Sequence, residues 1–76
     1  MDDAVTKELA AELLSLAQYM MYCSRIAPRQ KYPLAYCLYS QVLRVDKENK
    51  VARESAEMIE SIYDQIGRPR PSGECP

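Results

Sequence analysis

Helix-breaking residues interrupt this chain at only three places, and that spacing limits the fold more than any other feature. Pro28 closes a first segment, a polar run over 46–49 makes a second break, and Gly67 with Pro69 and Pro71 ends a third segment. Between the breaks, residues with high helix propensity predominate, and the whole chain has only two glycines. We therefore expect an all-α three-helix bundle, in which an antiparallel helix hairpin is followed by a third helix.

The expected helices cover about 3–26, 33–45 and 48–66, and together they make a single helical domain over 1–67. Pro33 suits the first turn of the second helix, where a missing N–H is no loss. Asp46 is placed to cap the start of the third helix, and Gly67 is placed as the left-handed residue that ends it. Residues 68–76 have too little apolar content to fold, so we expect a flexible C-terminal tail.

The first helix carries an unusually wide apolar arc. One stripe recurs at spacings of three and four: Val5, Leu9, Leu13, Leu16, Met20 and Cys23. A second stripe lies beside it: Ala10, Leu14, Ala17 and Met21. Such an arc is well past the ~100° of an ordinary surface helix. We therefore expect this helix to contact neighbours on two sides, as the centre of the domain or as the seam of a dimer. Any apolar surface that the core leaves uncovered is expected to bind another chain.

The other two helices each present a single inward face. The second is expected to bury Tyr32, Ala35, Tyr39, Val42 and Leu43. The third is expected to bury Val51, Ala52, Ala56, Ile59, Ile62, Tyr63 and Ile66, while its carboxylates face water. A core of this size supplies roughly 3 to 5 kcal/mol, so stability should be thin.

Composition argues against catalysis and against a metal or cofactor site. The chain has no histidine, which removes the commonest general base near neutral pH and the commonest transition-metal ligand. Its three cysteines are widely spaced and form no C-x-x-C pair. Ten basic and eleven acidic residues give a net charge of -1, so a nucleic-acid partner is not expected.

The same cysteines bear on location. Their number is odd and no signal peptide precedes them, so we expect reduced thiols and a cytoplasmic protein. No stretch approaches the ~20 consecutive apolar residues of a membrane span.

The 34 residues from Leu16 to Asn49 resemble one tetratricopeptide repeat. The resemblance is carried by Cys23, Tyr32, Ala35, Tyr39, Val42, Leu43, Asp46 and Asn49, with VLRVDKEN similar to the family's usual helix end and turn. The following ARESAEMIESIYDQIG is similar to the first helix of another repeat. The chain departs from the pattern at Gln30, where the family usually has glycine, and at Lys47, where it usually has proline. The resemblance implies a tetratricopeptide-like arrangement of about one and a half repeats.

A microtubule-interacting and trafficking domain is the alternative resemblance. That family has three helices, a similar length and a similar small-then-tyrosine pattern in its second helix. Its second helix usually runs further before turning, so the break over 46–49 favours the tetratricopeptide interpretation.

These patterns predict a non-enzymatic protein-interaction module, an adaptor or scaffold that receives another protein's helix or peptide segment or self-associates as a homodimer. The tetratricopeptide resemblance implies a groove lined by Met20, Ser24, Asn49, Glu57, Ser61 and Asp64. Tyr22, which lies away from the main apolar stripe, is a further candidate anchor for the partner. The family's lysine and asparagine clamp for acidic chaperone tails is absent, because Met20 and Ser24 occupy those positions. A small regulatory or nucleic-acid-associated factor acting as a dimer is the alternative function.

Overall fold

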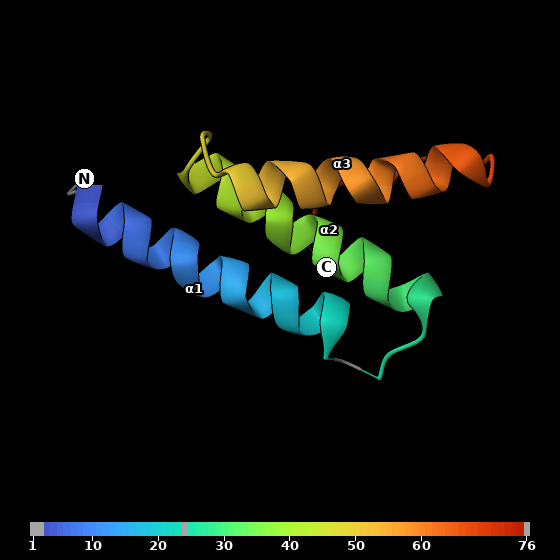
Figure 1. Cartoon of the computed structure of the whole chain (residues 1–76), viewed down its shortest axis with the longest axis horizontal. Coiled ribbons are helices and arrows are strands. Elements are labelled where there is room, and N and C mark those ends of the chain that lie inside the picture. The colour runs from blue at the N-terminus through green and yellow to red at the C-terminus, as the bar shows by residue number, and fades with distance from the viewer. Residues whose placement is uncertain (1–2, 24, 76) are drawn as a thin grey trace.

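The computed structural model describes residues 3–23 and 25–75, and within them the chain forms three α-helices (Figure 1). These are α1 (Asp3–Tyr22), α2 (Pro28–Val45) and α3 (Lys50–Gln65). Successive helices run in opposite directions. Helix α2 lies between the other two and packs against both, whereas α1 and α3 have little contact with each other. The predicted all-α three-helix architecture is therefore confirmed.

Two helix boundaries differ from the prediction. Helix α1 ends at Tyr22, before the predicted limit at residue 26. Helix α2 begins at Pro28, so the prediction that Pro33 starts it is wrong. A proline has no N–H to lose at the first helical position, and the N–H groups of Gln30 and Lys31 both reach the carbonyl oxygen of Ala27, at 2.9 and 2.8 Å. Pro33 lies inside α2 instead, where it has no N–H to donate to the carbonyl four residues earlier.

The predicted cap of α3 is also corrected. Asn49 caps the helix, because its side-chain oxygen accepts the Ala52 N–H at 3.0 Å. Asp46 closes α2, and its carboxylate accepts the Glu48 N–H at 3.2 Å within the turn. At the other end of α3, the prediction for Gly67 is confirmed. Its φ is +73°, and the following Arg68 N–H reaches the Tyr63 carbonyl oxygen at 3.0 Å, as in a Schellman motif.

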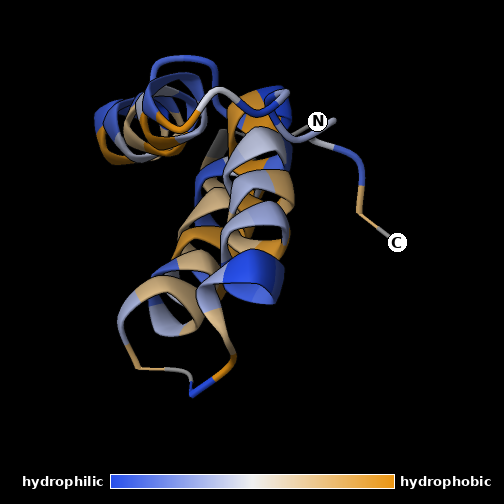
Figure 2. Cartoon of the chain, turned by 90° about the vertical axis from the view of Figure 1, so that its right-hand side faces the viewer, coloured by the Kyte–Doolittle hydropathy of each residue, from blue (hydrophilic) through white to orange (hydrophobic). Residues whose placement is uncertain are grey.

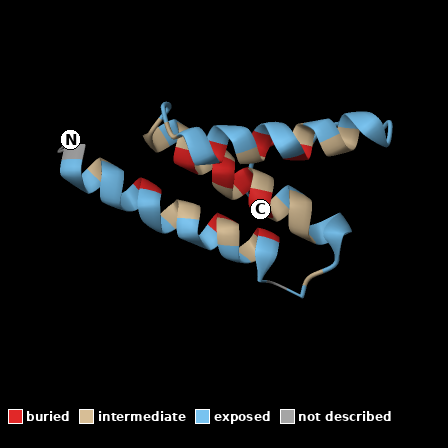
Figure 3. Cartoon of the chain, in the orientation of Figure 1, coloured by how far each residue is buried: buried red, intermediate tan, exposed pale blue. Residues whose placement is uncertain are grey.

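The core lies along α2, between its two neighbours (Figure 3). Small side chains bring the helices close together, and three larger ones fill the remaining space. The fully buried large side chains are Tyr39, Ile59 and Val42. The Tyr39 hydroxyl donates to Gln18 Oε1, so this buried α2 residue is hydrogen-bonded to α1. The outermost predicted core residues of α3, Val51 and Ile66, are exposed.

Residues 68–75 do not project freely from the end of α3, contrary to the expectation of an unfolded tail. They turn back across α2 and form what we call the C-terminal strap, in which Gly73 is buried and Cys75 is joined to Cys37 of α2. Low apolar content did not prevent this packing, because the strap is held by a disulfide and by charged groups. None of the helices described is long and apolar enough to cross a membrane.

Candidate interaction surface

The most distinctive surface feature is a row of exposed apolar side chains on α1, which we call the α1 strip. Its members are Val5, Leu9, Leu16 and Tyr19, which are 55%, 43%, 50% and 57% exposed. Figure 3 shows α1 as largely exposed, with buried positions confined to the side that faces α2. The buried α1 residues are Ala10, Ala17 and Met21, all from the second apolar stripe. The apolar arc of α1 is thus wider than its packing neighbour α2 covers, as its spacing predicts. The expectation that α1 could be the centre of the domain is wrong, because α2 lies between the other two helices.

Hydrophobic residues occur along all three helices (Figure 2). Beside the α1 strip, a shallow apolar groove runs between α1 and α2 and is lined by Leu16, Met20, Leu34 and Leu38, with both bridged cysteines. On the other flank of α1, Tyr19 and Tyr22 line a second depression together with Gln18 and Ser15. The α1 strip therefore has hollows on both sides, into which a partner's side chains could project.

The predicted partner-binding residues fall into two separate groups. Met20 is half-buried in the α1–α2 groove, and Tyr22 is 65% exposed on the far flank of α1. Glu57, Ser61 and Asp64 are exposed on α3, which has little contact with α1. Ser24 lies outside the described residues.

Two of the predicted partner-binding residues at α3, Asn49 and Asp64, make hydrogen bonds that stabilise the fold. Asn49 is the α3 cap, bound to the Ala52 N–H. Both carboxylate oxygens of Asp64 accept from the Arg70 guanidinium, at 3.0 and 2.7 Å. This contact holds the pKa of the Asp64 carboxyl below its usual value. The geometry therefore favours α1 over α3 as the apolar contact surface.

The strap is anchored by a polar network that sequence reasoning missed. Arg70 bridges Asp64 and Glu60, lying 3.9 Å from a Glu60 oxygen. The other Glu60 oxygen accepts the Tyr36 hydroxyl at 2.6 Å, which links the network to α2. Desolvation, followed by this hydrogen bond and the Glu60 charge, raises the pKa of Tyr36 to about 12. Nothing in the local sequence around Arg70 identifies these partners, because they come from two other elements.

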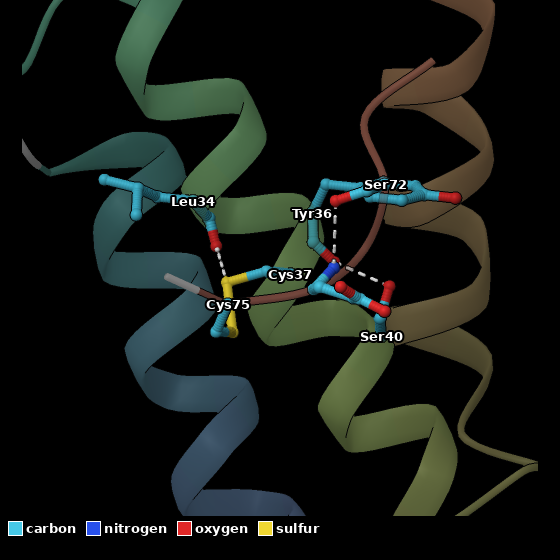
Figure 4. Close-up of a disulfide and its surroundings, with 7 residues drawn as sticks. Leu34, Tyr36, Cys37, Ser40, Ser72 and Cys75 are labelled. Carbon is cyan, nitrogen blue, oxygen red and sulfur yellow. Dashed lines mark hydrogen bonds between the residues drawn. A yellow bond between two sulfur atoms is a disulfide. The ribbon is translucent and has the colours of Figure 1, made fainter.

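Beyond Arg70 the strap crosses α2 and reaches the α1–α2 groove at Cys75 (Figure 4). Gly73 has a φ of +79°, and a Cβ there would meet Ser40 Oγ at 3.0 Å and Tyr36 Cε1 at 3.3 Å. The positive φ favours glycine, and a larger residue would also have to displace the Ser40 and Tyr36 side chains slightly. Cys37 is buried, and its sulfur lies 3.0 Å from the Leu34 carbonyl oxygen. The expectation of three reduced thiols is therefore corrected: among the described cysteines, Cys23 alone is free.

The α1 strip and its flanking hollows are lined mainly by apolar side chains. In the described ranges, no three or more histidine, cysteine, aspartate or glutamate side chains are grouped to hold a metal ion. The titratable groups with shifted pKa values belong to the strap network or to the Tyr39 contact between helices. Compared with protein-family models, curated proteins and solved structures, the chain gives no match.

Proposed function

We propose that this chain is a non-enzymatic protein-interaction module, an adaptor that binds another polypeptide through the α1 strip. The observation that carries the proposal is the exposure of Val5, Leu9, Leu16 and Tyr19 in one row along a single helix. An amphipathic helix of the partner fits such a surface, because its own apolar row would lie along the strip and insert into the flanking hollows. Tyr22 lines the depression on the flank of the strip together with Tyr19, where an exposed aromatic side chain can anchor a contact.

The size of the strip sets the strength of the contact. Full burial of one such side chain is worth about 1.5–3 kcal/mol, and each has roughly half of its surface left to cover, which gives about 1 kcal/mol per residue. The strip and a matching partner surface then contribute roughly 8 kcal/mol together, against an association cost of about 4–15 kcal/mol. At the low end of that cost about 4 kcal/mol remains, so we propose a weak, reversible contact with a Kd of about millimolar.

The tetratricopeptide-like arrangement and the cytoplasmic location remain part of this proposal. The order of helices, with a central α2 flanked by α1 and α3, is compatible with a repeat followed by the first helix of the next. The Cys37–Cys75 bond removes part of the basis for a cytoplasmic location, since disulfides persist mainly in oxidising compartments.

A photo-crosslinking amino acid at Tyr19, in the full chain expressed in cells, tests the proposal. We expect a reproducible set of crosslinked proteins that is lost when Leu16→Glu is added, because a carboxylate in the strip opposes apolar contact. Met58→Glu is the matched control, since Met58 is a 39% exposed apolar residue on α3. Crosslinks that are absent, or that persist in the Leu16→Glu background, would overturn the proposal.

A further inference from the structure

We infer that the partner of the α1 strip is the α1 strip of a second copy of this chain, with the two helices antiparallel. The inference rests on the proposed function and names its binding partner. Three features carry it: the spacing of the exposed positions, their symmetry along the helix, and the place of the one charged residue among them.

The exposed positions along the strip follow a coiled-coil repeat. Reading along the outer face of α1, they are Val5, Leu9, Glu12, Leu16 and Tyr19, followed by Cys23 just after the helix end, and they are separated by alternating steps of four and three. The Cys23 N–H still reaches the Tyr19 carbonyl oxygen at 2.9 Å, so Cys23 continues the helical register. All six are exposed. Two helices that pack along their length need this alternation at their shared seam, whereas a helix that only covers its own core does not need it on the outside.

The seam also matches itself when reversed. With a two-fold axis beside Leu14, each position meets one at the same distance on the other side of the axis: Val5 meets Cys23, Leu9 meets Tyr19, and Glu12 meets Leu16 of the second copy. A symmetric dimer needs this kind of self-complementary surface, because the same patch must serve both subunits. No seam position is left without a counterpart.

The acidic residue in the seam selects the antiparallel arrangement. In a parallel pair Glu12 would face Glu12 directly at a shared layer, which places like charges together in an apolar contact. In the antiparallel pair each Glu12 packs beside Leu16 of the second copy, and the helix dipoles also oppose each other favourably. Helix α1 has 20 residues and is ~30 Å long, so the interface falls at the small end for protein complexes and is reversible.

Sedimentation equilibrium of the purified full chain, over micromolar to millimolar concentrations, tests the pairing. We expect a monomer–dimer equilibrium that is abolished by Leu16→Glu and tightened at least tenfold by Glu12→Leu, which completes the apolar seam. Met58→Glu leaves it unchanged, and circular dichroism confirms that each variant is folded. A chain that stays monomeric throughout, with Glu12→Leu also monomeric, would overturn the inference.

Disulfide trapping tests the direction of the two helices. Val5→Cys should form a covalent dimer through Cys23 of the second copy under mild oxidation, and Val5→Cys combined with Cys23→Ser should not. A parallel pair would instead trap the unaltered chain through its two Cys23 residues, and that result would overturn the antiparallel arrangement. If the pure chain is monomeric while Tyr19 still crosslinks to a different protein in cells, this inference fails and the proposed function stands. Loss of both signals would overturn both.

Discussion

The Tyr36 hydroxyl makes the stability of the fold depend on pH in the alkaline range. Burial and the hydrogen bond to Glu60 raise its pKa from 10.0 to about 12, so the folded state keeps the phenolic proton over a range in which the unfolded state loses it. The stabilising effect is complete below pH 10 and is lost as the pH rises to about 12, because the unfolded state binds fewer protons there. We therefore expect the free energy of unfolding to decrease as the pH rises from 10 to about 12.

Urea unfolding at a series of alkaline pH values measures this slope. Tyr36→Phe should flatten it, because the substituted side chain has no proton to lose and no bond to Glu60 to break. Tyr22→Phe is the control, since Tyr22 is exposed on α1. An equal slope in Tyr36→Phe and in the unaltered chain would contradict the assignment.

At the scale of the elements, two residues compete as the cap of α3: Asn49, which caps it in the structure, and Asp46, which the sequence suggested. Asn49→Ala removes the acceptor of the Ala52 N–H and leaves that group without its cap, so we expect a loss of about 1 kcal/mol in the free energy of unfolding. Asp46→Ala removes only an exposed bond to the Glu48 N–H and should cost less. Chemical denaturation of both variants decides the point, and a larger loss for Asp46→Ala would show that Asp46 is the cap.

The helices could be predicted from the sequence because the signals that form and end them act between residues close together in the chain. Breakers and propensity place three helices, because both act within a few residues. The starts of α2 and α3 are harder to predict, because each has two suitable residues nearby. Pro28 and Pro33 both suit a first turn, and Asp46 and Asn49 are both capping types. The wide apolar arc of α1 did predict an exposed strip, since periodicity reports how many faces must be covered.

The strap could not be predicted on the same basis. Its contacts join residues far apart in sequence, such as Cys37 to Cys75, and no local pattern encodes such a pairing. Arg70 likewise reads as a loop charge until α3 and the strap are folded against each other. The predicted groove across α1 and α3 came from a family resemblance, and the positions it supplied on α3 line none of the apolar hollows beside α1.

At the scale of the whole molecule, the strap adds a link between α3 and α2, through Arg70 at one end and the disulfide at the other. Helix α3 packs mainly against α2, and the disulfide adds a covalent link from the strap to the middle of α2. Its two cysteines are 38 residues apart, and closing a loop of that length restricts the unfolded chain by about 4 kcal/mol in the chain-entropy model. That is as large as the roughly 3 to 5 kcal/mol that a small core supplies.

Cys75→Ser should therefore lower the free energy of unfolding by about 2–4 kcal/mol, measured by urea denaturation without reductant. The native contacts of α2 should survive, because the freed Cys37 thiol has the Leu34 carbonyl oxygen 3.0 Å away as an acceptor, so the buried sulfur is not left unpaired. Cys23→Ser is the control and should change little, since Cys23 is exposed and free. Under native, non-reducing conditions one thiol of the unaltered chain should react with a maleimide. Three reactive thiols would show that the strap is held by Arg70 without a covalent bond. Cys75→Ser and Cys23→Ser should then have the same free energy of unfolding.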